Sequence, residues 1–169
     1  EMTFDATHNA EKHLIKERLF SWHKLLFQDE NSNSNISIGY WRGEKGGEMQ
    51  VISGAMGKEK VHFQAPDYSV IDLEMNAFLE WINNEKDLDN ILKAAIAHLW
   101  FVTIHPFDDG NGRIARAIAD MLLARADNIS QRFYSMSSQI LIERKDYYNI
   151  LEKTQKGDLD ISDWLEWFL

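Results

Sequence analysis

The chain has 169 residues, of which 44% are hydrophobic and 27% charged, so it is long enough to form one domain with a sizeable core. Its net charge of −9 argues against a scaffold for DNA or RNA, which would usually be basic, and the absence of cysteine excludes disulfides and thiolate metal sites. No apolar run reaches the roughly 18 residues that a membrane span needs, and no signal-peptide pattern opens the chain.

These bounds predict a single cytoplasmic domain over residues 1–169, with no nucleic-acid partner and no membrane partner. The chain begins with Glu1 rather than with a methionine. We therefore expect it to be a fragment of a longer protein, lacking an upstream segment.

The first predicted helix covers residues 14–27, because apolar side chains recur there at helical spacing. These side chains are Ile15, Leu19, Trp22, Leu26 and Phe27. The stretch 31–35, which contains only asparagine and serine, predicts a solvated loop. Residues 36–42 then alternate apolar and small side chains, which is a weak signal for a strand.

Two short stretches with period-two alternation, 49–53 and 61–65, flank the glycine-bearing segment 54–59. This pattern predicts a β-hairpin. In an otherwise helical domain a lone hairpin has an unpaired edge, and such an edge can accept an extended peptide by strand addition. A purely structural hairpin that caps the core is the alternative interpretation.

Helical spacing returns after the hairpin and continues to the end of the chain. It predicts helices over 69–82, 88–104, 114–126 and 161–168, and one or two more over 137–155. The stretch 88–104 is apolar nearly all round, which is typical of a central, buried helix. His98 within it is expected to be a core histidine rather than a catalytic partner. The predicted fold class is mainly α, with one small hairpin.

Twelve residues, His-Pro-Phe-Asp-Asp-Gly-Asn-Gly-Arg-Ile-Ala-Arg, connect two of these apolar helices at positions 105–116. Pro106 should end the first helix, because the residue before a proline avoids the α region. Gly110 and Gly112 bracket the start of the second helix, where free N–H groups and the helix dipole attract anions. Arg113 and Arg116 lie three residues apart on its first turns, so the segment predicts a diphosphate-binding site.

Two further side chains of the segment fit chemistry on bound phosphates. The carboxylate of Asp109 can hold a Mg²⁺ against the phosphate oxygens. The imidazole of His105 can act as a general base beside them. The twelve residues therefore combine a base, a metal ligand and an anion site.

The same twelve residues match the signature of the Fic family, His-x-Phe-x-(Asp/Glu)-Gly-Asn-Gly-Arg-x-x-Arg, at every fixed position. The chain resembles this family, and the predicted hairpin and flanking helices extend the resemblance across most of its length. The resemblance implies a Fic-type helical bundle whose hairpin is the flap that holds the target, through Val61, His62 and Phe63. It also implies a protein adenylyltransferase, which moves AMP from ATP to a Ser, Thr or Tyr hydroxyl.

The resemblance assigns the phosphate contacts to the start of the second helix. Backbone N–H groups around Gly110, Asn111 and Gly112 are expected to hold phosphate oxygens. Arg113 is expected to clamp the β-phosphate region, and Arg116 to hold the γ-phosphate and orient ATP. Positioning and charge stabilisation do most of the work in phosphoryl chemistry.

The chemical step is assigned to the residues before that helix. His105 is expected to take the proton of the target hydroxyl as it attacks the α-phosphorus. Mg²⁺ is expected on Asp109, with Asp108 as the competing ligand, and Phe107 should anchor the loop in the core. One of Tyr147 and Tyr148, in the predicted helical stretch 137–155, could stack on the adenine, because Fic domains often place an aromatic residue there. Packing of these tyrosines in the core is an equal alternative.

Several alternatives to AMP transfer remain compatible with the sequence. Fic-like enzymes can transfer UMP, phosphocholine or phosphate, and some remove AMP from a target. A non-enzymatic adaptor regulated by a nucleotide is a further alternative. Many Fic proteins are inhibited by a helix with the pattern (Ser/Thr)-x-x-x-Glu-(Gly/Asn). Neither of the nearest matches, at 7–12 and 162–167, has the required last residue. An inhibitory helix is therefore expected upstream of Glu1 or on a separate protein.

Overall fold

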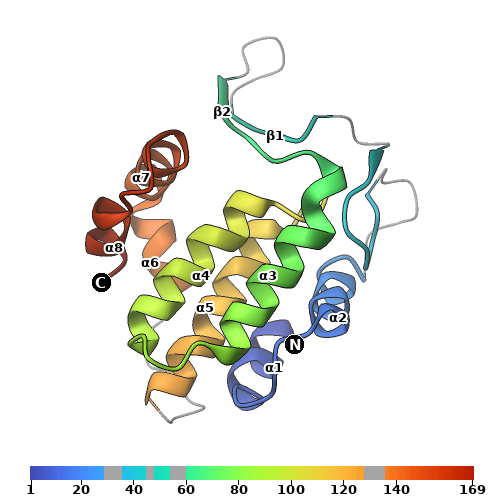
Figure 1. Cartoon of the computed structure of the whole chain (residues 1–169), viewed down its shortest axis with the longest axis vertical. Coiled ribbons are helices and arrows are strands. Elements are labelled where there is room, and N and C mark those ends of the chain that lie inside the picture. Colours follow the sequence, from blue (N-terminus) through green and yellow to red (C-terminus); the bar gives the residue numbers. More distant parts are fainter. Residues whose placement is uncertain (29–35, 45–47, 54–59, 128–135) are drawn as a thin grey trace.

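Helices make up most of the structure. The computed structural model describes residues 1–28, 36–44, 48–53, 60–127 and 136–169 (Figure 1). Its helices are α1 (Met2–His8), α2 (Lys16–Leu26), α3 (Ile71–Asn84), α4 (Asn90–Ile104), α5 (Asn111–Asp127), α6 (Met136–Ile142), α7 (Arg144–Lys156) and α8 (Ser162–Phe168), with a short 3₁₀ helix η2 (Tyr68–Val70) before α3. The predicted mainly α fold class is confirmed.

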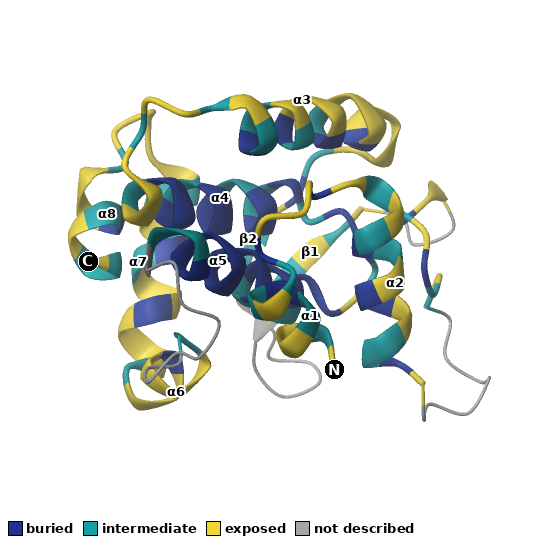
Figure 2. Ribbon diagram, turned by 90° about the horizontal axis from the view of Figure 1, so that it is seen from below, coloured by how far each residue is buried: buried dark blue, intermediate teal, exposed yellow. Residues whose placement is uncertain are grey.

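Helices α4 and α5 form the centre of the bundle and pack extensively against each other. The side chain of Asp89 caps the start of α4 by accepting hydrogen bonds from the N–H groups of Ile91 and Leu92. The apolar positions of α5 lie at helical spacing and are fully buried at Ile114 and Ile118. Figure 2 shows this pair as the most deeply buried part of the molecule, as the apolar sequence of residues 88–104 predicts.

The remaining helices cover this pair from two sides. Helices α1, α2 and α3 lie on one side and α6, α7 and α8 on the other (Figure 1). Large buried side chains come from both groups, among them Trp22 of α2, Phe78 of α3 and Trp164 of α8. The indole N–H of Trp164 donates to the carbonyl of Ala95, which ties α8 to α4. None of the helices in the described part is both long and apolar enough to cross a bilayer.

The predicted hairpin is present and extends beyond the helical bundle near the C-terminal end of α4 (Figure 1). Strands β1 (Gln50–Ser53) and β2 (Lys60–Gln64) pair antiparallel, with Gln50 opposite Gln64. The register shifts between Val51 and Ile52, where a bulge interrupts the ladder. The predicted turn, residues 54–59, lies outside the described residues.

The weak strand signal at 36–42 is wrong. The described backbone there is a turn followed by irregular structure. Gly39 has a φ of +77°, which a strand residue does not adopt, and its N–H donates to Nδ1 of His23 at 2.9 Å. Tertiary contacts therefore decide the backbone of this segment, and the alternation of apolar residues does not.

Helix α1 is a second departure from the sequence prediction, because residues 1–13 lack an amphipathic pattern. Its Ala6 is fully buried, and its Asp5 accepts hydrogen bonds from the indole of Trp22 at 2.7 Å and from Nε of Arg18 at 2.9 Å. These contacts with α2 stabilise a helix that is too short to be stable by itself.

Candidate functional site

The twelve-residue segment 105–116 begins where α4 ends. His105 caps α4 in the left-handed conformation, with φ 52° and ψ 56°, and its N–H donates to the carbonyl of Phe101. Among the described residues it is the one with positive φ that is not a glycine. A left-handed residue with a β-carbon is strained. Pro106, which the sequence predicts as the helix stop, follows directly.

Buried side chains hold the loop after His105 in place. The side-chain amide of Asn111, which is only 2% exposed, accepts from the N–H of Phe107 at 2.9 Å and donates to its carbonyl at 2.8 Å. The ring of Phe107 is fully buried and stacks on His23, with ring centroids 4.2 Å apart. The prediction for Phe107 is confirmed. The amide of Asn111 has structural partners, so a phosphate can meet only the backbone N–H of this residue.

The start of α5 is shaped for close approach of an anion. Gly110 has a φ of +82°, and a β-carbon there would lie 3.1 Å from a methyl carbon of Leu26. Its N–H donates to the side chain of Asp109 at 2.6 Å, and its carbonyl receives the first hydrogen bond of α5, from Ile114. The N–H groups of the first helical turn, which includes Gly112, have no partner within the helix and point toward the incoming chain.

The ring of His105 is held in one tautomer. Its Nδ1 lies 3.0 Å from the carbonyl oxygen of Val102. A carbonyl can only accept, so Nδ1 carries the proton and Nε2 of the neutral ring keeps its lone pair. Burial is the main cause that lowers the pKa of His105 below its ordinary value of 6.5, and the charge of Arg42 lowers it further. The hydrogen bond to Val102 and the charge of Asp109 oppose this shift. The ring is therefore neutral at neutral pH.

A pocket of about 160 Å³ opens beside this histidine. Of the predicted site residues, His105, Gly112, Arg116, Tyr147, Tyr148 and His62 line it. Residues Val51, Val102, Leu151, Glu152 and Gln155 complete the wall. Elements that are far apart in the sequence, β1, β2, α4, α5 and α7, thus meet at one cavity.

The other two predicted flap residues, Val61 and Phe63, are not among the residues that line this pocket. Val61 is 43% exposed and Phe63 is half-buried, while His62 between them reaches Glu152 of α7, with Nδ1 and Oε2 2.5 Å apart. Glu152 also accepts a hydrogen bond from Lys156 at 2.8 Å. The hairpin is therefore held against α7 by a polar contact at the edge of the pocket.

Tyr147 and Tyr148 differ in how far their rings are exposed. Tyr147 is only 3% exposed, and its hydroxyl lies 2.9 Å from Nε2 of His98. Tyr148 is 45% exposed, and its ring lies under the guanidinium of Arg144. Tyr147 is therefore mainly a core residue that reaches the pocket wall, whereas Tyr148 offers a ring to a ligand.

The predicted metal ligand and the first arginine lie next to each other outside the buried loop. The Asp109 side chain is 61% exposed, and its Oδ2 lies 3.5 Å from the Arg113 guanidinium, which also covers the ring of Phe27. Its competitor Asp108 accepts a hydrogen bond from the N–H of Ser37 at 2.8 Å. Asp109 is therefore the more available of the two carboxylates.

Three residues of the site have no motif in the sequence to reveal them. The buried His23 donates from Nε2 to the carbonyl of Asp109 at 3.1 Å and so fixes the backbone of the proposed metal ligand. Glu152 contacts His62 of the hairpin, and Arg42 contacts the backbone of His105 and Pro106. The only signal in the sequence for Arg42 is its position directly after two aromatic residues.

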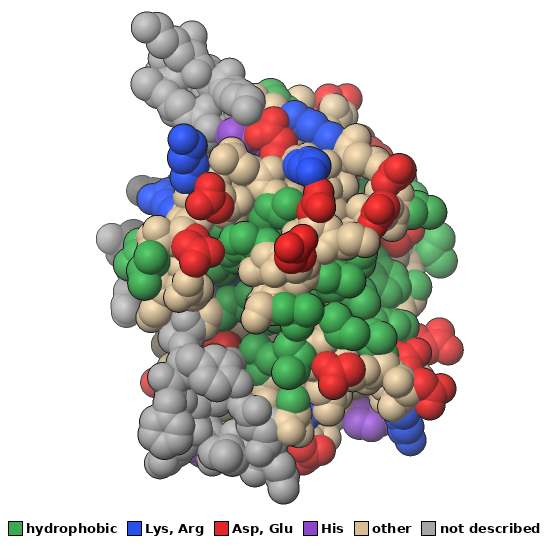
Figure 3. Space-filling view, turned by 90° about the vertical axis from the view of Figure 1, so that its left-hand side faces the viewer, with side chains coloured by type: hydrophobic (Ala, Val, Ile, Leu, Met, Phe, Trp, Pro, Cys, Tyr) green, Lys and Arg blue, Asp and Glu red, His purple; other side chains and the backbone are tan. Residues whose placement is uncertain are grey.

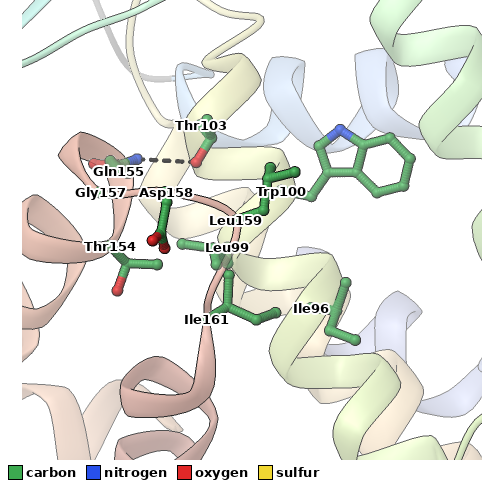
Figure 4. Close-up of a pocket in the computed structure, with 10 residues that line it drawn as sticks. All are labelled: Ile96, Leu99, Trp100, Thr103, Thr154, Gln155, Gly157, Asp158, Leu159 and Ile161. Atoms are coloured by element: carbon green, nitrogen blue, oxygen red, sulfur yellow. Dashed lines mark hydrogen bonds between the residues drawn. The ribbon is translucent and has the colours of Figure 1, made fainter.

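A second cavity, of about 580 Å³, lies between α4 and the segment that joins α7 to α8 (Figure 4). Its wall is mostly apolar and includes Leu99, Trp100 and Ile161. Gln155 lines both cavities and donates to the hydroxyl of Thr103 at 3.1 Å. The surface on this side of the molecule carries hydrophobic side chains with acidic ones around them (Figure 3).

In this helical domain the N-terminal turn of α5, Arg116 and the neutral ring of His105 meet at one pocket. Residues 13–123 match the family model for the Fic/DOC family. The chain belongs to this family, as its twelve-residue signature predicts.

Curated relatives agree with this assignment. The chain is 25% identical over 158 residues to a probable protein adenylyltransferase of Aquifex aeolicus, covering 94% of the chain and 42% of that protein. It is 37% identical over 93 residues to a protein adenylyltransferase Fic of Nematostella vectensis, covering 53% of the chain and 20% of that protein. The chain thus spans less than half the length of these relatives.

Solved structures share the fold. A Fic family protein from Desulfovibrio desulfuricans superposes with a TM-score of 0.75 at 23% identity, over 98% of this chain and 46% of that one. A Fic domain containing signaling protein from Bacteroides thetaiotaomicron gives a TM-score of 0.72 at 21% identity, over 98% of this chain and 62% of that one. These likenesses support the helical fold over nearly the whole chain.

Proposed function

We propose that this domain transfers AMP from ATP to a hydroxyl group of a target protein. The observation that carries the proposal is the convergence of His105, Arg116 and the N-terminus of α5 on one pocket, with Nε2 of His105 free to accept a proton. The names of the curated relatives support the same activity.

In the proposed step the hydroxyl oxygen of the target attacks the α-phosphorus of ATP, and its proton passes to Nε2 of His105. The bond from the α-phosphorus to the oxygen that bridges to the β-phosphorus breaks, and pyrophosphate leaves. The free N–H groups at Asn111 and Gly112 and the guanidinium of Arg116 stabilise the negative charge on the phosphates. Arg113 is assigned to the β-phosphate at the rim of the site.

The residues present fit a Mg²⁺ that arrives with the nucleotide. Asp109 offers an exposed carboxylate beside the helix N-terminus. The described residues contain no group of three acidic or histidine side chains that could hold a metal by themselves, so phosphate oxygens and water would supply the other ligands, as is usual for this ion. When bound, the ion neutralises charge on the phosphates.

The adenine of ATP and the target protein are assigned to different residues. The exposed ring of Tyr148 is the proposed platform for the adenine, because an aromatic face stacks well on any base. The hairpin residues Val61, His62 and Phe63 are the proposed contacts for an extended segment of the target, which would add to a strand edge. The target itself is a protein that presents a Ser, Thr or Tyr hydroxyl.

Labelled ATP tests the proposal. The chain is incubated with Mg²⁺, a cell lysate and ATP labelled at either the α- or the γ-phosphate, and labelled bands are identified by mass spectrometry. A protein adduct labelled from the α-position only, and lost in His105→Ala, is the expected result. Label from the γ-position would instead indicate phosphate transfer. ATP binding without any adduct would indicate a nucleotide-regulated adaptor.

A further inference from the structure

The buried Arg42 makes three hydrogen bonds that join the catalytic segment to the base of the hairpin. Its Nε donates to the carbonyl of His105 at 2.8 Å and its Nη2 to the carbonyl of Pro66 at 2.5 Å. Its backbone N–H donates to the carbonyl of Pro106 at 2.8 Å. The residue is only 4% exposed, so water cannot replace these contacts.

Two of the contacts bear on the conformation of His105. The orientation of a carbonyl is set by the ψ angle of its own residue, and His105 is in the strained left-handed region at φ 52° and ψ 56°. Such a conformation persists only where surrounding groups hold it. By holding the carbonyls of both His105 and Pro106, Arg42 opposes relaxation toward ordinary helical or extended backbone. In this backbone conformation the ring of His105 makes its hydrogen bond to the carbonyl of Val102.

The third contact reaches the hairpin. Pro66 lies two residues after the end of β2, and Ala65 between them extends the hairpin by donating to the carbonyl of Met49 at 2.9 Å. A rigid guanidinium that bonds His105 and Pro66 simultaneously fixes the distance between the end of α4 and the end of β2. A charged group is buried here at a cost, and its hydrogen bonds to carbonyls offset that cost.

We propose that Arg42 is a positioning residue, which holds the catalytic backbone of His105 in place and sets it in register with the hairpin that presents the target. The inference rests on the proposed AMP transfer. Arg42 is not among the residues that line the pocket beside His105. Its loss should therefore lower the rate of transfer without lowering the affinity for ATP.

A second arginine, the half-buried Arg125, gives a control. Arg125 of α5 donates from Nε to the carbonyl of Ala10 at 2.5 Å and from Nη2 to the carbonyl of Lys12 at 3.0 Å. Burial lowers its pKa, as it lowers that of Arg42. It makes the same kind of contact at the opposite end of α5 from the pocket. Arg125→Met should therefore lower stability in the same way without disturbing the position of His105.

The experiment compares Arg42→Met, Arg42→Lys and Arg125→Met with the parent chain. Thermal midpoint, Mg²⁺-ATP affinity and the kcat of transfer from α-labelled ATP are measured for each. We expect Arg42→Met and Arg125→Met to lose similar stability and to bind ATP within about twofold of the parent. Only Arg42→Met should lose kcat, by about 10²-fold, because a shift of about 1 Å has effects of that size. Arg42→Lys, which keeps the charge and one donor group, should recover part of the rate.

Equal loss of kcat in Arg42→Met and Arg125→Met, or loss of ATP affinity in parallel with kcat in Arg42→Met alone, would overturn the proposal. If the parent chain transfers no AMP, the proposed function fails but Arg42 is still tested. The ring signals of His105 and His62, assigned by NMR with His105→Gln and His62→Gln, should move in the Arg42 variants and stay in Arg125→Met. Unchanged signals in all variants reject the positioning role. If Arg42→Met does not fold, Arg42→Lys and Arg42→Gln decide by the same signals.

Discussion

The middle and the end of helix α4 each carry a histidine, and the two rings have opposite surroundings. His98 in the middle is fully buried, stacked on Trp164 with ring centroids 5.5 Å apart and bonded through Nε2 to the hydroxyl of Tyr147. His105, two turns later, lies where the helix ends, and its Nε2 is free at a pocket. Burial lowers the pKa of both rings.

The comparison separates burial from function. Both histidines are neutral at neutral pH, so a lowered pKa by itself does not mark the base. What distinguishes His105 is its place at the left-handed end of α4, where it lines the same pocket as Gly112 and Arg116 of α5. A histidine within the helix has Tyr147 and Trp164 as neighbours and no path to a substrate. The predictions below test this division, from the largest expected effect to the smallest.

Replacing the end histidine should affect catalysis and leave the fold intact. In His105→Ala we expect transfer from α-labelled ATP to fall by about 10²–10⁴-fold, which is the usual contribution of a general base, while ATP affinity stays the same. The parent rate should also fall on the acid side only below pH 6.5, because the pKa of His105 is lowered and the neutral ring is the active form. An acid limb centred above pH 6.5, or a fully active His105→Ala, would contradict the assignment.

The two neighbouring aspartates should differ in their effect on the metal. Asp109→Ala should lower Mg²⁺-dependent ATP affinity by at least about tenfold, because this exposed carboxylate is the proposed metal ligand. Asp108→Ala should cost only the hydrogen bond to the N–H of Ser37, about 1 kcal/mol of stability. Isothermal titration with and without Mg²⁺ measures both variants. A Mg²⁺ effect lost in Asp108→Ala and kept in Asp109→Ala would reverse the assignment.

Substitutions of the adjacent tyrosines should also have different effects, one on ATP affinity and the other on stability. Tyr148→Ala removes the exposed ring, and we expect the affinity for ATP to fall about tenfold, as loss of base stacking commonly costs about 1–3 kcal/mol. Tyr147→Phe keeps the ring and removes the hydroxyl that meets His98, so it should lower the free energy of unfolding and leave ATP affinity unchanged. Fluorescent-nucleotide competition and urea unfolding check the pair. The reverse pattern would make Tyr147 the adenine platform.

His98, in the middle of α4, should affect the pH dependence of stability and not the transfer activity. Burial lowers the pKa of His98 from 6.5 to about 3, so between these values the unfolded chain binds a proton that the folded chain does not. The free energy of unfolding should therefore fall as pH drops through this window, by up to about 1.4 kcal/mol per pH unit from this one group. In His98→Gln the slope should be smaller by one proton, whereas transfer activity at pH 7.5 should stay close to that of the parent. Urea unfolding at several pH values measures the slope, and an identical slope in both chains would contradict the buried neutral state.

The hairpin contact should give the smallest effect. Glu152→Gln weakens the interaction with His62 at the pocket edge without removing side-chain volume. We expect KM for a target protein to rise severalfold, in line with about 1 kcal/mol for a partly exposed pair, and kcat to change little. The matched control is Lys153→Met, a change on the same helix as Glu152 that removes a surface ion pair with Asp163 of α8. A fall in kcat with unchanged KM would assign Glu152 to the chemical step.

The sequence by itself determined the composition of the site and most of the helices. The segment at 105–116 is short, so its loop, its helix stop at Pro106 and its helix start between Gly110 and Gly112 follow from local backbone preferences. Helical periodicity likewise located α4 and α5, because the spacing of apolar residues along a helix identifies the face that it buries. The family followed from the same twelve residues.

Only the tertiary structure decided which residues support that site. Arg42 lies in a segment that alternation marks as a strand, yet its contacts with His105 and Pro66 place it in irregular backbone. Tyr147 and Tyr148 are equivalent in the sequence, and only the packing of α7 against His98 makes one a core residue and the other exposed. Contacts of this kind join residues far apart in the chain, and their partners depend on how the helices assemble, which local spacing does not encode.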